Sequence, residues 1–192
     1  MVWTNVPDEE SAHILVRGYQ SNGKPMTDVL LLSDLKGVGT QPDICFNPED
    51  HHFLVVWNQR YKETGWDIKG FCLDRDFYSR GKLSISSASE HQQMPRVAYS
   101  PGADRYFVVW EDGRSASSFD IYGQLIGRDR VLAGSAISVF VSVHADEDPV
   151  VAGHDRDSEF VVALARDISG AGHFQVYARI LEGTGKIGDY FS

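Results

Sequence analysis

The sequence lacks several features that would place it in common functional classes. No stretch approaches the roughly 18 apolar residues of a membrane-spanning helix, and apolar residues do not recur with a helical period. Lys and Arg number only 18 against 27 Asp and Glu, a net charge of −9 at pH 7. A chain this acidic has no general attraction for phosphate backbones or anionic lipid, so nucleic acid and membrane surfaces are disfavoured partners.

Cysteines and targeting signals are equally scarce. Only Cys45 and Cys72 are present, and we place them in two strands separated by a third. That spacing of roughly 9–10 Å exceeds the roughly 7 Å limit of a disulfide, so we expect free, mostly buried thiols. Residues 1–5 show neither the basic start nor the apolar centre of a signal peptide, and the cellular location stays unknown from these residues.

What the chain does contain is a repeat of about 53 residues. The segments FLVVW (53–57) and DIKG (67–70) recur, 53 residues later, as YFVVW (106–110) and DIYG (120–123). A weaker copy covers 149–178, and Val2 and Trp3 with Ile14 resemble the end of a further copy upstream. A fixed period of this length indicates stacked units that bury their apolar faces on one another.

Each copy contains short runs of β-branched and aromatic residues separated by Gly, Asn, Asp, Pro and Ser, the pattern of strands joined by turns. The run 53–57 is apolar on both faces, as in a strand covered by sheets on both sides. We therefore predict an all-β protein, a β-propeller-like array of about four four-stranded antiparallel blades forming one domain over 1–192. The repeats are placed at 1–40, 41–93, 94–147 and 148–192. Two β-sandwiches are the alternative, although halves of a sandwich would not repeat at this length.

The strand count predicts one missing strand. The first strand of the opening copy would precede residue 1, which leaves 15 strands and an incomplete first blade. Three explanations stay open: a four-bladed ring that closes with an incomplete blade, a longer array from which this sequence is cut, or two chains that share one larger ring.

The segments 107–114 (FVVWEDGR) and 119–124 (FDIYGQ) resemble the repeat of bacterial propeller-like proteins, of the type FVVWEDxR…DIYGQ. The resemblance is closest at 95–126 and fades at 149–192, where Ala163 replaces the tryptophan. It implies a scaffold for binding with no shared catalytic residues, often in secreted or cell-surface proteins.

No motif indicates catalysis or a metal. Glu111 and Asp112 adjoin Asp120, but acid and base catalysis requires carboxylates converging from different blades, and the copies do not obviously diverge into such a set. The acidic residues 146–148 are interpreted as an ordinary charged loop. We predict no catalytic residues, no metal and no cofactor, and therefore a protein that is not an enzyme.

Loops on one propeller face remain the best candidates for recognition, namely 58–66, 111–119 and 164–173. A mixture of arginine and aromatic residues there suits sugar or peptide binding; packing of Trp66 and Phe119 between blades is the alternative. The predicted binding residues are Arg60, Tyr61, Trp66, Glu111, Asp112 and Arg114. The predicted function is a non-catalytic binding or scaffold module for a carbohydrate, peptide or protein, with possible self-association through the incomplete first blade. Two alternatives are a glycan-active hydrolase and a purely structural repeat of a larger surface protein.

Overall fold

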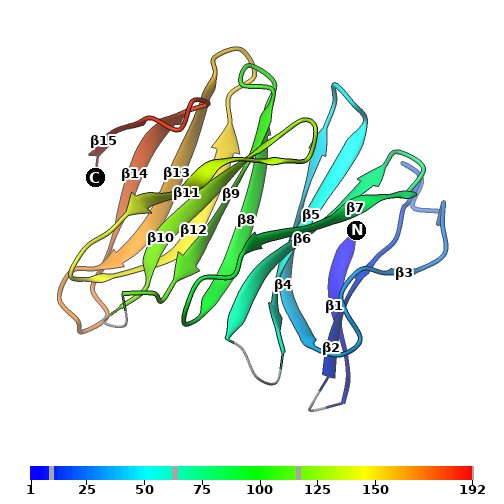
Figure 1. Cartoon of the computed structure of the whole chain (residues 1–192), viewed down its shortest axis with the longest axis horizontal. Coiled ribbons are helices and arrows are strands. Elements are labelled where there is room, and N and C mark those ends of the chain that lie inside the picture. The colour runs from blue at the N-terminus through cyan, green and yellow to red at the C-terminus, as the bar shows by residue number, and fades with distance from the viewer. Residues whose placement is uncertain (9–10, 62–64, 116–117, 192) are drawn as a thin grey trace.

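The computed structural model describes residues 1–8, 11–61, 65–115 and 118–191. These residues form fifteen strands in four antiparallel sheets, which follow one another along the chain and stand side by side (Figure 1). The described part of the chain has no helix long and apolar enough to cross a membrane.

Each sheet is a meander in which consecutive strands pair. The first sheet contains β1 (Val2–Asp8), β2 (Ser11–Val16) and β3 (Leu30–Leu31). The second contains β4 (Val38–Asn47), β5 (His52–Arg60), β6 (Trp66–Asp74) and β7 (Ser79–Ser86). The third contains β8 (Gln92–Ser100), β9 (Arg105–Asp112), β10 (Asp120–Gly127) and β11 (Leu132–Phe140). The fourth contains β12 (Ala145–Gly153), β13 (Glu159–Asp167), β14 (Phe174–Glu182) and β15 (Ile187–Phe191).

The predicted all-β, propeller-like fold is confirmed, including the three-stranded first sheet. By the repeat, β1 corresponds to the second strand of the other sheets, so the strand that the first sheet lacks is its first. The second, third and fourth sheets begin at Val38, Gln92 and Ala145, a few residues before the repeat boundaries set from the sequence. Those boundaries followed the prolines, which lie inside the strands.

The second strands of the second and third sheets, β5 and β9, are apolar on both faces because each face meets a different neighbouring sheet. Leu54 and Val56 of β5 pack against the third sheet, whereas Val55 and Trp57 pack against the first. In β9, Phe107 and Val109 contact the fourth sheet. We call the side of a sheet that meets the next sheet its forward face and the side that meets the preceding sheet its backward face. Every pair of consecutive sheets thus encloses one hydrophobic cluster.

Trp57 and Trp110 occupy equivalent buried positions, as the sequence predicts. Their exposed fractions are 3% and 0%, and both indoles lie on backward faces. Each Nε1 donates to the residue two positions further on, Trp57 to Gln59 Oε1 at 3.0 Å and Trp110 to Asp112 Oδ2 at 2.8 Å. The repeat therefore extends from the backbone to side-chain hydrogen bonding.

The glycine of the DIxG segment makes room for a forward-face side chain. A Cβ at Gly123 would lie 2.4 Å from the ring of Phe107, on the neighbouring strand β9. A side chain there would force that ring out of its contact with the fourth sheet. Gly70 holds the same place in the second sheet, where Leu54 and Ile85 are the close neighbours.

The first and fourth sheets lie at opposite ends of the row (Figure 1). Within the described residues, no hydrophobic cluster joins them. This arrangement argues against the first of the three explanations for the missing strand, closure of a four-bladed ring within one chain. It leaves the forward face of the fourth sheet and the backward face of the first without a neighbouring sheet.

The two cysteines are free, as predicted. Cys45 lies in β4 and Cys72 in β6, and each pairs with Leu54 of the strand between them. Burial raises the pKa of both thiols to about 11. Both sulfurs are therefore protonated at neutral pH and serve as packing groups.

Candidate functional site

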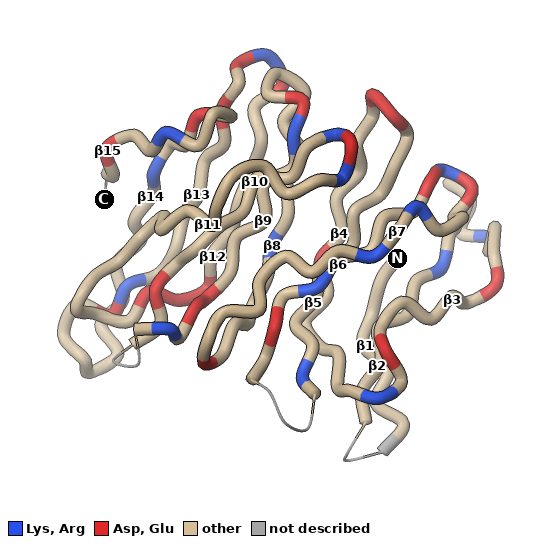
Figure 2. The backbone as a smooth tube through the Cα atoms, viewed as in Figure 1, with Lys and Arg blue, Asp and Glu red and all other residues tan. Residues whose placement is uncertain are grey.

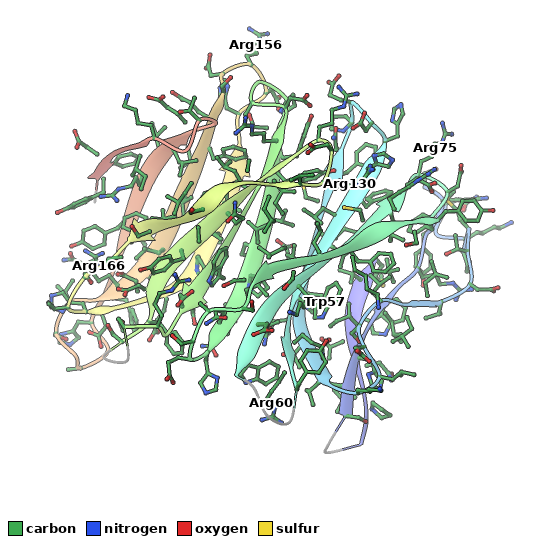
Figure 3. The ribbon with its side chains drawn as sticks, viewed as in Figure 1. Trp57, Arg60, Arg75, Arg130, Arg156 and Arg166 are labelled. Atoms are coloured by element: carbon green, nitrogen blue, oxygen red, sulfur yellow. The ribbon has the colours of Figure 1, made fainter. Side chains whose placement is uncertain are left out.

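The described residues of the predicted recognition loops lie at one end of the sheets. Figure 3 shows Arg60 and Arg166 at that end, while Arg75 and Arg156 lie at the opposite end. Residues 62–64 of the first predicted loop and 116–117 of the second lie outside the described residues. All six predicted binding residues are described.

Arg60, Tyr61 and Trp66 lie together at the end of the second sheet. Arg60 is the last residue of β5 and pairs across the sheet with Trp66, the first residue of β6. The guanidinium carbon of Arg60 lies 5.2 Å from the centre of the Trp66 ring, a cation–π contact. Arg60 is exposed and Trp66 is half-buried, so the pair presents a positive charge beside an aromatic ring at the predicted recognition end.

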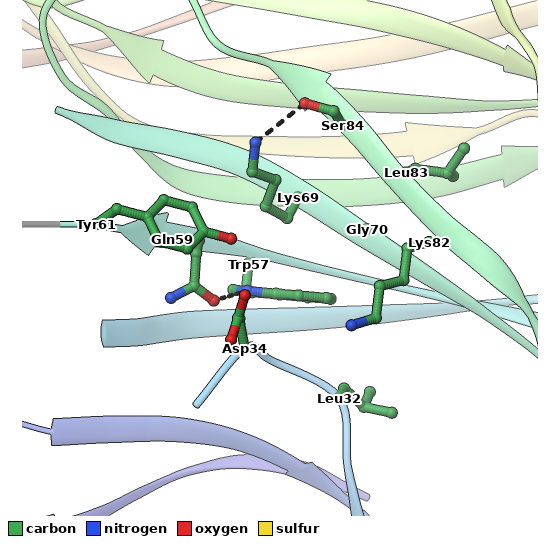
Figure 4. Close-up of a pocket in the computed structure, with 10 residues that line it drawn as sticks. All are labelled: Leu32, Asp34, Trp57, Gln59, Tyr61, Lys69, Gly70, Lys82, Leu83 and Ser84. Carbon is green, nitrogen blue, oxygen red and sulfur yellow. Dashed lines mark hydrogen bonds between the residues drawn. The ribbon is translucent and has the colours of Figure 1, made fainter. Parts of the chain in front are cut away.

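Tyr61 lines a cavity of about 240 Å³ between the first and second sheets (Figure 4). The other residues that line it are Leu32, Asp34, Trp57, Gln59, Lys69, Gly70, Lys82, Leu83 and Ser84. Lys69 Nζ is held by Asp67 at 2.8 Å and Ser84 Oγ at 3.0 Å. The buried Gln59 Nε2 has no hydrogen-bond partner among the described residues.

This cavity combines an aromatic wall with polar groups, a composition typical of small-molecule sites. Its volume falls below the roughly 300–1,000 Å³ of most ligand pockets.

Asp112 and Arg114, which the sequence predicts as binding residues, are bound to each other. Asp112 is fully buried and accepts from the backbone N–H, Nε and Nη2 of Arg114 at 3.0, 2.8 and 2.6 Å. The guanidinium of Arg114 also stacks on the ring of Tyr122, 3.9 Å from its centre. These contacts saturate the carboxylate and much of the guanidinium, so the pair stabilises the end of the third sheet.

Three equivalent bulges lie at the start of the first strands β4, β8 and β12. Each bulge places a residue with positive φ before a proline: Gln41 at 54°, Met94 at 52° and Asp148 at 51°. The left-handed region is unfavourable for side chains other than glycine, and proline disfavours helical conformations in the residue before it. Because these strands contact one another across consecutive sheets, the strained residues form a line, and Met94 N–H donates to Gln41 Oε1 at 3.2 Å.

Glu111 meets the acidic start of β12 at the third of these bulges. Its Oε1 accepts from the backbone N–H of Asp148 at 2.8 Å, and its Oε2 accepts from Gln93 Nε2 at 2.8 Å. Burial raises the pKa of Glu111, and the nearby carboxylates of Asp148 and Glu147 raise it further, against the two hydrogen bonds. Figure 2 shows Asp and Glu gathered near β12. Carboxyl groups of the third and fourth sheets thus lie close together, and the pKa of one of them, Glu111, is raised.

The raised pKa of Glu111 predicts a specific dependence of stability on pH. Ionising this carboxyl is harder in the folded protein than in the unfolded chain, so stability falls as pH rises from about 4.5 through the raised pKa. Glu111→Gln removes the charge. Its amide oxygen can accept from the Asp148 N–H, and its amide nitrogen can donate to Gln93 once that side-chain amide turns over, so the variant is expected to be the more stable protein at neutral pH. Denaturant unfolding of both proteins at pH 4 and 7 measures this difference.

Glu182→Gln is the matched control for that experiment. Lys186 lowers the pKa of Glu182, so this carboxylate contributes stability above its unfolded pKa and loses the contribution as pH falls. The two variants should therefore change with pH in opposite directions. A Glu111→Gln protein that is less stable than the wild type at pH 7 and equal to it at pH 4 would contradict the raised pKa.

The interpretation of residues 146–148 as a charged loop is wrong. All three lie in β12, where Asp146 is fully buried and bound by Arg166 Nε at 2.6 Å and Nη2 at 3.0 Å. Glu147 and Asp148 follow at the bulge beside Glu111. The strand register shows that the copies also diverge at Glu111. This residue corresponds to Asn58 in the second sheet and to Ala165 in the fourth, where Leu164, and not Ala163, takes the place of Trp110. The prolines at 42, 95 and 149 are the one sequence signal for the three bulges, because each follows the residue with positive φ.

No protein-family model and no curated protein matches the chain, but solved structures share its fold. An N-acetylgalactosamine deacetylase from F. plautii superposes with a TM-score of 0.58 at 9% identity, over 93% of this chain and 61% of its own. An endo-arabinase from Bacteroides thetaiotaomicron gives 0.58 at 10%, over 94% and 70%. An α-L-arabinofuranosidase from Clostridium thermocellum gives 0.51 at 13%, over 99% and 70%.

These comparisons confirm the β-propeller-like fold. The resemblance to one particular bacterial repeat finds no match among them. The prediction that the chain is not an enzyme needs correction, because it treats the fold as that of a non-catalytic scaffold, whereas the three solved structures above share the fold and are named as enzymes. The chain spans 61% of the deacetylase chain and 70% of the other two. The activities that their names state therefore belong to longer chains.

Proposed function

We propose that this protein is a glycan-active propeller that hydrolyses glycosidic bonds, with Glu111 as its general acid. The observation that carries the proposal is the meeting of Glu111 with Glu147 and Asp148 across two sheets, combined with the raised pKa of Glu111. Glycoside hydrolysis uses two carboxyl groups with opposite proton states on the two sides of the bond that breaks. Similar folds among carbohydrate-directed enzymes support the same proposal.

The chemistry assigns one proton transfer to each carboxyl. Glu111 retains its proton to higher pH than an ordinary glutamate and donates it to the glycosidic oxygen as the bond to the anomeric carbon breaks. A more exposed carboxylate at the bulge, Asp148 or Glu147, accepts a proton from the water that attacks that carbon. The strained backbone at Asp148 holds its N–H against Glu111 Oε1 and so fixes the position of the acid.

Substrate binding is assigned to the same end of the sheets. Trp66, stacked on Arg60, offers an aromatic surface for a sugar ring, and Tyr61 offers a hydroxyl beside the cavity of Figure 4. A glycan substrate outside the cell also agrees with the secreted or cell-surface location that the repeat resemblance implies.

The experiment is release of reducing sugar from arabinan, xylan and aryl glycosides by the wild type and Glu111→Gln. The variant is expected to lose activity by about 10²–10⁴-fold, the usual contribution of a general acid. The wild-type rate should fall as pH rises and Glu111 ionises. Asp148→Asn should lower the rate as well and move that fall to lower pH, because it removes a charge that raises the pKa of Glu111.

Glu49→Gln is the matched control. Glu49 is an exposed acid in the turn between β4 and β5, at the opposite end of the second sheet, and its variant should keep the full rate. Hydrolysis that survives Glu111→Gln unchanged, in a variant that unfolds in one cooperative transition, would refute the assignment of the acid. Absence of hydrolysis on every substrate would refute the proposed reaction for these glycans.

A further inference from the structure

The forward face of the fourth sheet has the composition of a face that packs on another sheet. In the third sheet, the forward residues Phe107, Ile121 and Leu125 are at most 2% exposed because the fourth sheet covers them. The strand register identifies their counterparts in the fourth sheet. Phe107 pairs with Leu125 as Val161 pairs with Ile180, so Val161 and Ile180 correspond to Phe107 and Leu125. Glu111 pairs with Ile121 as Ala165 pairs with Val176, so Val176 corresponds to Ile121.

These counterparts are apolar but exposed. Val161 is 43% exposed, Val176 69% and Ile180 36%. The positions between them are Ala163 and Ala178, so no charged side chain interrupts this part of the face. Antiparallel sheets that face water ordinarily alternate apolar and polar residues, and a continuous apolar patch of this kind marks an interaction surface.

The backward face of the first sheet carries a complementary row at the other end of the molecule. Trp3 pairs with Leu15 and Leu15 with Leu31, so the three side chains form a line across all three strands. Trp3 holds the position that Trp57 and Trp110 hold in the next two sheets, where each indole packs on the preceding sheet. Here Leu31 is 42% exposed, and no preceding sheet lies against this row within the described residues.

We propose that a second copy of this chain covers these surfaces, the forward face of the fourth sheet of each copy packing on the backward face of the first sheet of the other. The contact would repeat the sheet-to-sheet packing that the chain already makes three times within itself. An interface between two different faces of identical chains closes into a ring when the rotation allows it. Two copies supply eight sheets, within the four to eight blades that propellers usually have, whereas three copies would exceed that range.

The test begins with the mass of the full chain in solution, by light scattering across a dilution series. The expected mass is twice 21.4 kDa, with dissociation on dilution. Val176→Asp should weaken association at least about 30-fold, as expected when a charge is buried in a closed apolar interface. Because Val176 is exposed in the single chain, the variant should fold normally. Val143→Asp is the control, since Val143 is 90% exposed between β11 and β12.

Mixing two variants tests the head-to-tail arrangement. Leu31→Asp damages the backward face and Val176→Asp the forward face, so each variant alone should be monomeric. A mixture retains one intact interface, between the forward face of the first variant and the backward face of the second, and should recover association in part.

Three results would overturn the proposal. A wild-type mass of 21.4 kDa at every concentration would mean that no second copy binds, as expected if further repeats of a longer polypeptide cover the face. A Leu31→Asp protein that stays dimeric while Val176→Asp becomes monomeric would mean that two forward faces pair. A dimer that neither variant weakens would place the contact elsewhere.

Discussion

Replacing Trp110 by alanine is expected to lower the free energy of unfolding by about 3–5 kcal/mol, the range for large aromatic side chains removed from cores. Trp110 is fully buried in the cluster between the second and third sheets. Its truncation opens a cavity where both neighbouring sheets are fixed by other contacts. It also leaves the carboxylate of Asp112 without its hydrogen bond from Nε1, at 2.8 Å.

Denaturant unfolding of Trp110→Ala and Trp66→Ala measures this effect against a matched change. Trp66 is the first residue of β6, half-buried and stacked on Arg60, and its removal should cost about 1 kcal/mol. Equal losses for the two variants would contradict the assignment of Trp110 to a sheet-to-sheet core.

Replacing Asp112 by glutamine is expected to destabilise the protein by about 3 kcal/mol, because it removes one charge of a buried ion pair. The Asp112 carboxylate is fully enclosed and makes three hydrogen bonds to Arg114. Without it, the guanidinium loses its counter-charge while the Tyr122 ring and the sheet still surround it. The effect is placed at the low end of the range because the side chain of Arg114 is 29% exposed.

The repeat supplies a compensating change. One period earlier, Gln59 and Tyr61 stand in the positions of Asp112 and Arg114, and Gln59 accepts from Trp57 as Asp112 accepts from Trp110. The double variant with Asp112→Gln and Arg114→Tyr should therefore be more stable than Asp112→Gln alone, as measured by the midpoint of chemical denaturation. A double variant that loses the sum of both single effects would mean that the two sites are not equivalent.

Much of the fold follows from local patterns. The apolar runs at 53–57 and 106–110, with the DIxG segments that follow, predict the strands, their burial on both faces and the equivalent places of Trp57 and Trp110. These features depend on contacts within one sheet and its immediate neighbours. The missing first strand was also predictable, because it is a matter of counting strands within a fixed period.

The candidate site was less accessible to such reasoning. Glu111 was selected for its place in a loop after a strand, but its contact with Asp148 depends on how two sheets stack, and no local pattern encodes that. Glu147 and Asp148 read as a solvated acidic stretch because nothing in their immediate sequence reveals the bulge. A motif within one stretch of sequence does not indicate this group of carboxylates, because they come from non-equivalent positions in two copies.

The most direct test of the central claim, that carboxyl groups of the third and fourth sheets meet at Glu111 and raise its pKa, is an NMR titration of the Glu111 side-chain carboxyl carbon in the wild type and in Asp148→Asn. The account predicts an apparent pKa above 4.5 in the wild type, and a lower value in the variant because a neighbouring negative charge is lost. A Glu111 pKa at or below 4.5, or one that Asp148→Asn leaves unchanged, would contradict it.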